Sequence, residues 1–204
     1  MTAIQQRGDV GAVASTHWLA TATAMSVLER GGNAFDAATA GAFVLYVAEP
    51  DQNGPGGEVA IVLRTSSDRV VRVVCGQGPT PAAATIETFA RLGLDLIPGS
   101  GVLAACVPGA VDAWLALLER FGTWSLAEVL APAIAYASSG VPVSPGLARR
   151  IAGIAEHVRA HWSTTAAIYL ASGLPRAGDR LRNRAFAATL ERLARESTSA
   201  PSRE

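Results

Sequence analysis

The chain is poor in aromatic side chains, has only two cysteines and carries no net charge. Of its 204 residues 6% are aromatic, and 17 basic residues balance 17 acidic ones. Without an excess of positive charge, the chain has no field that would attract a phosphate backbone or an anionic lipid. No apolar run reaches the roughly 20 residues that a membrane-spanning helix needs. The composition therefore argues against nucleic acid and membranes as partners.

The two cysteines, Cys75 and Cys106, each lie in an apolar run. A small buried thiol is the common state of such a residue, so we expect two buried thiols and no disulfide. The sequence suggests no metal site and no cofactor. Because the N-terminus lacks the charged and apolar segments of a secretory signal, we expect a cytoplasmic protein.

Hydrophobic residues make up half of the sequence, and glycine and proline are scattered between periodic segments rather than pooled. A chain of this length can bury one core but hardly two. We therefore expect a single domain over residues 1–204, with a polar, frayed tail at 196–204. Low aromatic content and many alanines predict close-packed helices.

The first quarter of the sequence predicts a short strand and two helices. The strand at 11–15 precedes a helix at 17–30, with Thr16 as its N-cap. Asn33 caps the second helix and forms a capping box with Asp36. This second helix is apolar around almost its whole circumference, so we expect most of it to be buried.

A β-hairpin is predicted next, with strands at 59–63 and 70–75 joined by a turn at 65–68. The segment Gly54–Gly57 before it resembles an anion-cradling loop. However, a strand and not a helix follows that segment, which favours a tight turn with close backbone approach.

The rest of the chain is predicted to be mostly helical. Ser125 and Glu128 form a second capping box. Apolar residues recur at helical spacing in five segments: 86–92, 108–121, 125–138, 144–159 and 184–195.

One of these helices follows a strand-like run at 101–107, and Pro108 fits its first turn. The expected buried face of this helix carries Val111, Trp114, Leu115 and Leu118.

Candidate catalytic residues are scarce. The three histidines are His17, His157 and His161, and none stands beside a recognisable nucleophile motif. His157 and His161 lie four residues apart in a predicted helix, but a metal site would need a third ligand. No spacing brings two carboxylates together as an acid/base pair. We assign no catalytic and no metal-binding residue.

The order of motifs is more informative than the individual side chains. From about residue 8 to residue 195, seven stretches resemble the large-subunit opening of the γ-glutamyltransferase family, in the family's order. These stretches are GDVGAVASTHWLAT, VLERGGNAFDAATA, EPDQNGPGGE, PTPAAAT, GVLAACVPGAVDAW, FGTWSLAEVLAPAIAYASSGVPVS and GDRLRNRAFAATLERLA.

The resemblance implies an α+β fold, namely part of the αββα sandwich of N-terminal-nucleophile hydrolases, here helix-rich with one β-hairpin. In that family a precursor cuts itself, so that a threonine becomes the N-terminus of a small subunit and acts as the nucleophile. This threonine lies beyond the region matched here. We therefore expect an incomplete large-subunit portion, inactive alone, that needs a small-subunit-like chain to act on γ-glutamyl or related amide bonds.

One large-subunit residue of the family reaches its active site, an arginine that grips the substrate's α-carboxylate. The matching run here is Gly76–Pro81, with Gln77 at the place of the arginine. Glutamine offers a neutral hydrogen bond but not a charged bidentate one. The family's glycine-rich loop corresponds to Asp51–Glu58.

Three hypotheses for function follow. In the first, the complete enzyme is an acylase-like amide hydrolase or acyltransferase whose substrate lacks a glutamyl α-carboxylate, as Gln77 indicates. In the second, it transfers γ-glutamyl groups and a residue outside this chain reads the carboxylate. In the third, the chain is a non-catalytic remnant or a partner subunit that binds a separately encoded small-subunit-like chain. The third predicts exposed apolar surface on the strands at 59–63 and 70–75, and a lone hairpin predicts marginal stability or self-association.

Overall fold

The computed structural model describes residues 7–199, and its internal contacts fall into two compact units. The first unit comprises Met1–Gly54 and Leu117–Glu204, and the second comprises Pro55–Ala116. The expectation of one domain over residues 1–204 stays a prediction.

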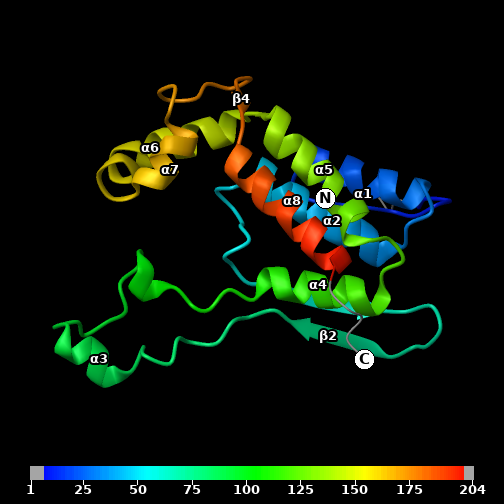
Figure 1. The fold of residues 1–204 in the computed structure, drawn as a ribbon, viewed down its shortest axis with the longest axis horizontal. Helices are drawn as coiled ribbons and strands as arrows, with labels where there is room; N and C mark the ends of the chain where they lie inside the picture. Colours follow the sequence, from blue (N-terminus) through cyan, green and yellow to red (C-terminus); the bar gives the residue numbers. More distant parts are fainter. Residues whose placement is uncertain (1–6, 200–204) are drawn as a thin grey trace, which may run out of the picture. The chain divides into compact units, whose positions relative to one another are not determined.

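Helices build the core of the first unit. Those that pack together are α1 (Trp18–Glu29), α2 (Ala34–Ala48), α5 (Leu126–Ser139) and α8 (Arg184–Ser199). α2 packs against both α1 and α5, and α5 also packs against α8 (Figure 1). The small side chains of Ala40 and Ala133 are completely buried in this core. Because such side chains let helix axes approach closely, the predicted close packing is confirmed.

α2 is the most deeply buried helix of this core. Ten of its 15 residues are buried, as its uniformly apolar sequence predicts. Phe43 and Val44 are completely buried. Thr39 is buried too, but its hydroxyl donates to the Phe35 carbonyl at 2.8 Å, so this polar group keeps a hydrogen bond.

The N-cap of α1 is His17 and not Thr16, so this prediction was wrong. Nδ1 of His17 accepts a hydrogen bond from the Leu19 N–H at 3.2 Å. The Thr16 hydroxyl donates instead to the Glu49 carboxylate. The predicted strand at 11–15 is also wrong, because the segment joins neither of the sheets found among residues 7–199.

The predicted capping box at the start of α2 is confirmed, and it extends into a larger network. Oδ2 of Asp36 accepts from the Asn33 N–H at 2.8 Å and from the Thr123 hydroxyl at 2.6 Å. Oδ1 accepts from the N–H groups of Thr123 and Trp124 at 2.9 and 3.2 Å. The Asn33 side-chain amide donates to the Phe121 carbonyl at 2.6 Å. The start of α2 is thereby fixed to the turn before α5.

Burial by itself would raise the pKa of Asp36, which is completely shielded from solvent. The hydrogen bonds from Thr123, Asn33 and Trp124 outweigh burial and lower this pKa below its ordinary value of 3.8. The carboxylate is therefore held in its charged form in the folded chain.

The second predicted capping box is also confirmed, because Ser125 and Glu128 bond reciprocally at the start of α5. After α5, a short antiparallel pair joins β3 (Val141–Pro142) to β4 (Arg180–Leu181). This pair was not predicted.

Two helices lie between these short strands. α6 (Pro145–His161) was predicted, but α7 (Ser163–Tyr169) was not. α8 extends to Ser199, so residues 196–199 of the predicted tail are helical. The remaining tail residues, 200–204, lie outside the described part of the chain.

The second unit contains the predicted hairpin, formed by β1 (Ala60–Arg64) and β2 (Val71–Cys75) in antiparallel register. Val62 pairs with Val73, and Arg64 pairs with Val71, so these side chains share one face of the ribbon. Val62, Val73 and Val71 are 71%, 67% and 63% exposed. The predicted exposed apolar surface on these strands is present.

A charged contact defines the turn of this hairpin. The Asp68 carboxylate accepts from the Val70 N–H at 3.0 Å and pairs with the Arg72 guanidinium at 2.7 Å. The hydrogen bond from Arg72 is the main reason that the pKa of Asp68 falls to about 2. These contacts of Asp68 stabilise the turn predicted at 65–68.

Two predictions fail in the rest of the second unit. The run at 101–107 is not a strand: it contains the 3-10 helix η1 (Val102–Ala104). Cys75 and Cys106 are both exposed rather than buried. The Cys75 side chain belongs to the open face of β2, and an apolar run alone cannot tell which face is covered. α3 (Ile86–Arg91) is present, but none of its residues is buried.

α4 (Ala110–Phe121) begins two residues after Pro108, so the predicted position of this proline in the first helical turn was wrong. The helix buries Ala110, Ala113 and Leu117, which recur at helical spacing. Leu118 is also buried, as predicted, but the other members of the predicted face are only partly buried: Val111, Trp114 and Leu115.

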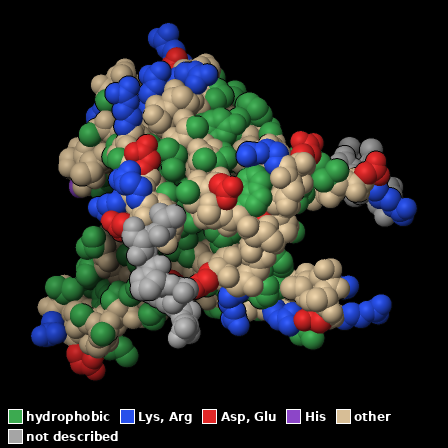
Figure 2. All heavy atoms as spheres, turned by 45° about the vertical axis from the view of Figure 1, so that its right-hand side comes forward, with side chains coloured by type: hydrophobic (Ala, Val, Ile, Leu, Met, Phe, Trp, Pro, Cys, Tyr) green, Lys and Arg blue, Asp and Glu red, His purple; other side chains and the backbone are tan. Residues whose placement is uncertain are grey.

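On the face shown in Figure 2, acidic and basic side chains both occur, with hydrophobic side chains between them. None of the helices within residues 7–199 combines the length and the apolar character needed to cross a bilayer.

The Asp36 network yields a stability prediction. Replacing the carboxylate by an amide, Asp36→Asn, places an NH₂ group against backbone donors and leaves them unsatisfied. We expect the free energy of unfolding at neutral pH to fall by about 2–4 kcal/mol. Urea unfolding followed by circular dichroism measures this change, and Glu156→Gln on the exposed side of α6 is the matched control.

The same variant tests the pH dependence. Because the folded-state pKa of Asp36 is lowered, its stabilisation is complete above the unfolded pKa and is lost as pH falls through the folded value. The wild-type chain should therefore lose stability on acidification more steeply than Asp36→Asn. If the free energy of unfolding of both proteins fell with the same slope on acidification, this role for Asp36 would be contradicted.

Candidate functional site

Gln77, the predicted substrate-binding residue, is the second residue after β2 in the second unit. The ladder of the hairpin continues to its neighbour Gly76, whose N–H donates to the Val59 carbonyl at 2.7 Å. Gly76 is buried, whereas Gln77 is exposed. The Cys75 thiol lies 3.8 Å from Oε1 of Gln77. A fixed backbone therefore presents an accessible amide side chain.

Three backbone segments meet beside Gln77. The Val107 N–H donates to the Pro79 carbonyl at 3.0 Å. The N–H groups of Gly109 and Ala110 both donate to the Gly57 carbonyl, at 3.3 and 3.2 Å. Hydrogen bonds thus join the end of the glycine-rich loop, the segment after β2 and the start of α4.

Glycine is required where these segments cross. A β-carbon at Gly78 would lie 1.4 Å from the Val107 carbonyl oxygen, and one at Gly109 would lie 2.5 Å from the Gly76 carbonyl oxygen. No side chain fits such gaps. The Gly57 carbonyl accepts two of the hydrogen bonds at this crossing. This agrees with the prediction that Gly54–Gly57 forms a tight turn in which backbones approach closely, rather than a loop that binds an anion.

The chemistry available to Gln77 is neutral hydrogen bonding. Its amide can donate two hydrogen bonds and accept two, but it supplies no charge to a substrate carboxylate. The structure places Gln77 in an accessible position, and its substrate-binding role stays a prediction.

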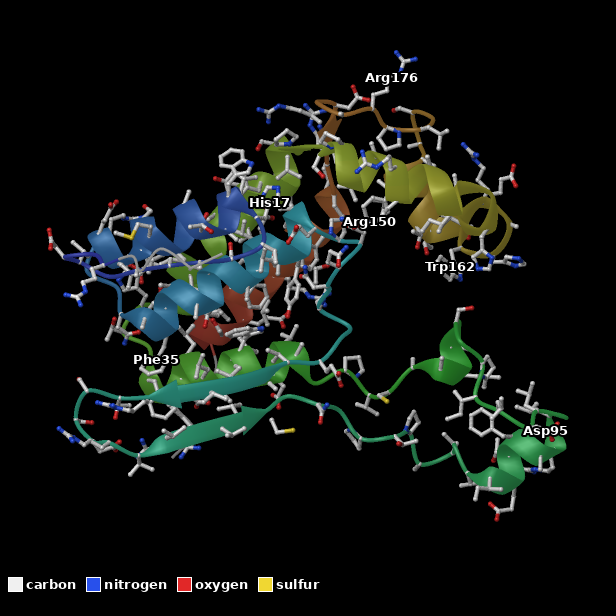
Figure 3. The ribbon with its side chains drawn as sticks, turned by 180° about the vertical axis from the view of Figure 1, so that it is seen from behind. His17, Phe35, Asp95, Arg150, Trp162 and Arg176 are labelled. Atoms are coloured by element: carbon white, nitrogen blue, oxygen red, sulfur yellow. The ribbon has the colours of Figure 1, made fainter. Side chains whose placement is uncertain are left out.

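The three histidines lie on two elements of the first unit. His17 caps α1, whereas His157 and His161 lie on α6, with ring centroids 4.6 Å apart. Figure 3 labels His17 and Trp162, which lie at different helix ends. Across residues 7–199, no group of three or more His, Cys, Asp or Glu residues could hold a metal ion.

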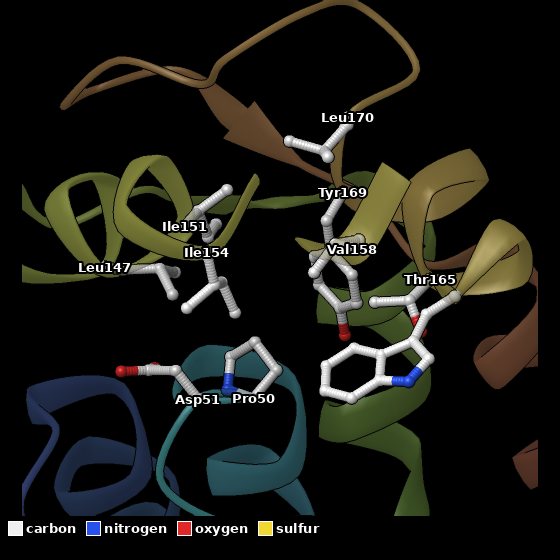
Figure 4. Close-up of a pocket in the computed structure, with 10 residues that line it drawn as sticks. Pro50, Asp51, Leu147, Ile151, Ile154, Val158, Thr165, Tyr169 and Leu170 are labelled. Atoms are coloured by element: carbon white, nitrogen blue, oxygen red, sulfur yellow. The ribbon is translucent and has the colours of Figure 1, made fainter. Parts of the chain in front are cut away.

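A cavity of about 180 Å³ in the first unit was missed by the sequence analysis. Ile151, Ile154 and Val158 of α6 lie across from Pro50 and Asp51 (Figure 4). The other lining residues are Leu147, Trp162, Thr165, Tyr169 and Leu170. Burial raises the pKa of Tyr169 above its ordinary value of 10.0. The cavity depends on α7, which the sequence did not predict.

Two glycines of the second unit provide a matched test of the backbone crossing. We expect Gly78→Ala to destabilise the second unit by more than about 2 kcal/mol, because the Val107 backbone must move. Gly56→Ala should change stability by less than about 0.5 kcal/mol, since nothing lies within 4 Å of its added β-carbon.

Hydrogen–deuterium exchange measures the difference locally. In Gly78→Ala, the N–H groups of Val107, Gly109 and Ala110 should lose protection, whereas in Gly56→Ala they should keep it. Equal protection in both variants would contradict the role given to Gly78.

Comparisons with known proteins agree with this architecture. The sequence profile described as Gamma-glutamyltranspeptidase matches residues 20–200. The chain is 37% identical over 203 residues to the Acylase ACY 1 proenzyme of Pseudomonas sp. (strain SE83), covering 95% of this chain and 36% of that proenzyme. The chain spans about a third of the length of such curated relatives.

Solved structures extend the similarity to three dimensions. The structure of LmbA2991HD matches with a TM-score of 0.88 and 51% identity, covering 92% of this chain and 32% of that one. The γ-glutamyltranspeptidase of Helicobacter pylori matches with a TM-score of 0.87 and 28% identity, covering 96% of this chain and 57% of that one. The predicted partial N-terminal-nucleophile hydrolase fold is thereby confirmed. The chain belongs to the γ-glutamyltranspeptidase family, in which it corresponds to the N-terminal part of the large subunit.

Proposed function

We propose that this chain is the large-subunit part of an amide hydrolase or acyltransferase and is inactive until a small-subunit-like chain supplies the nucleophilic threonine. The observation that carries this proposal is the family match over residues 20–200, combined with coverage of only about a third of the relatives' length. An N-terminal threonine would serve as nucleophile, and its own α-amino group would act as the base.

The open face of the hairpin supports a protein partner. Val62, Val71 and Val73 are each more than half exposed and lie together on one face. An isolated two-stranded hairpin is at best marginally stable in water. Contact with another layer would remove this apolar surface from water, at about 25 cal/mol per Å² buried. We assign this face to the small-subunit-like chain.

The presence of Gln77 favours a substrate that has no α-carboxylate beside this residue. Its amide is exposed and neutral, and a neutral hydrogen bond is roughly half as strong as a charge-assisted one. The similarity to an acylase proenzyme agrees with an amide substrate of this kind. We therefore favour an acylase-like hydrolase over strict γ-glutamyl transfer.

Co-expression tests the partner assignment. The chain would be produced with the product of the coding DNA that follows Glu204, read in all three frames. We expect Val73→Asp to weaken the association at least tenfold, because a carboxylate would be buried in an apolar contact. The control Ser66→Asp lies at an exposed position of the hairpin turn and should leave association unchanged. Absence of any threonine-bearing product would favour a non-catalytic remnant instead.

Substrate preference tests the role of Gln77 in the complete enzyme. Gln77→Arg should raise kcat/KM for a γ-glutamyl anilide about tenfold relative to its decarboxylated analogue, because a charged fork binds the α-carboxylate. Gln77→Lys should raise this kcat/KM less, since lysine supplies a positive charge but cannot donate two parallel hydrogen bonds to the carboxylate. A wild-type enzyme that already prefers the γ-glutamyl anilide by tenfold would contradict the proposal.

A further inference from the structure

We propose that the cavity beside α6 and α7 binds a neutral, monocyclic aromatic molecule with one hydrogen-bonding substituent, such as a phenol. All ten lining residues belong to the first unit, whereas Gln77 belongs to the second. This inference therefore stands apart from the proposed amide hydrolysis.

The size and walls of the cavity set the ligand's size. Its volume of about 180 Å³ is similar to that of an engineered enclosed apolar cavity, about 150 Å³, that takes up benzene, and it opens to solvent beside Ile154, which is 52% exposed. The wall is mostly aliphatic, from Leu147, Ile151, Ile154, Val158 and Leu170. One ring with a small substituent fills such a space.

Two aromatic side chains favour an aromatic ligand over an aliphatic one. Trp162 and Tyr169 both line the cavity, and aromatic rings gain energy from offset or edge-to-face contacts beyond their area burial. His157 meets the Trp162 ring edge-to-face, with centroids 4.9 Å apart. This contact holds the indole in place at the end of α6.

The cavity also offers hydroxyl groups. Thr165 and Tyr169 are the side chains with hydroxyl groups among its lining residues. Burial raises the pKa of Tyr169, and a side-chain hydrogen bond with Asn183 lowers it by a smaller amount. A hydroxyl group can both donate and accept, so either Thr165 or Tyr169 can form a hydrogen bond with an oxygen substituent of the ligand.

Charge at the cavity is already compensated. Asp51 lines it, but its carboxylate forms an ion pair with the Arg150 guanidinium, and the Gln52 amide donates to the same carboxylate at 3.2 Å. A charged ligand would lose hydration without gaining an unpaired counter-charge. The site should therefore select neutral molecules.

Binding can be measured on the 204-residue chain with ¹⁵N-tryptophan labelling. The four tryptophans give four indole N–H resonances, and Trp162→Phe identifies the one in the cavity. Titration with phenol at neutral pH should shift the Trp162 resonance with a dissociation constant of about 1 mM or lower. The Trp18 resonance should stay in place. Cyclohexanol and benzoate should bind at least about fivefold more weakly.

Cavity variants provide the control. Ile154 is 52% exposed, so Ile154→Trp can cover the cavity without disturbing the core, and it should abolish the phenol-induced shift. Leu174 is 50% exposed and does not line the cavity, so Leu174→Trp should bind like the wild type. Tyr169→Phe should weaken phenol binding several-fold and leave toluene binding unchanged. Equal phenol binding by Ile154→Trp and the wild type, or equal shifts at Trp18 and Trp162, would overturn the proposal.

Discussion

The buried carboxylate of Asp36 is the interaction on which the helical first unit depends. It collects four hydrogen bonds at the start of α2, two of them from backbone N–H groups of the turn that precedes α5. A charged carboxylate is favourable at a helix N-terminus, where backbone donors point outward. Residues 87 and 88 positions apart in sequence are thereby joined, and the α2–α5 contact follows from this junction.

Once α2 is fixed, its small residues determine how closely its neighbours can lie. A β-carbon at Gly41 would lie 3.5 Å from the Ala20 carbonyl oxygen and from the Ala24 side chain of α1. Larger residues on this face would push the helices apart and leave voids, which destabilise a core. Small residues on this face of α2 are therefore a requirement of the close packing of α1 against α2.

The second unit relies on backbone contacts rather than on a side-chain core. Gly76, Gly78 and Gly109 allow three segments to cross within hydrogen-bonding distance, and the Gly57 carbonyl accepts two of the hydrogen bonds there. The valines on the open face of the hairpin, by contrast, are exposed. The uncovered apolar face agrees with a chain that spans only about a third of the length of its curated relatives.

Local signals in the sequence determined much of this structure. Capping boxes at Asn33 and Ser125, helical periodicity and the turn between two β-rich runs each act over a few residues, so they were readable directly. Motif order likewise indicated the family, which the profile match over residues 20–200 confirmed. These features need no knowledge of distant contacts.

Tertiary structure decided the rest. Segments 11–15 and 101–107 have strand-like composition, but a strand exists only where a partner strand lies beside it. The exposure of Cys75, the buried side of α4 and the cavity lined by α6 and α7 depend on which element covers each surface. The sequence by itself therefore determined the local elements and the family, whereas burial and the shape of the cavity were set by contacts between residues far apart in the chain.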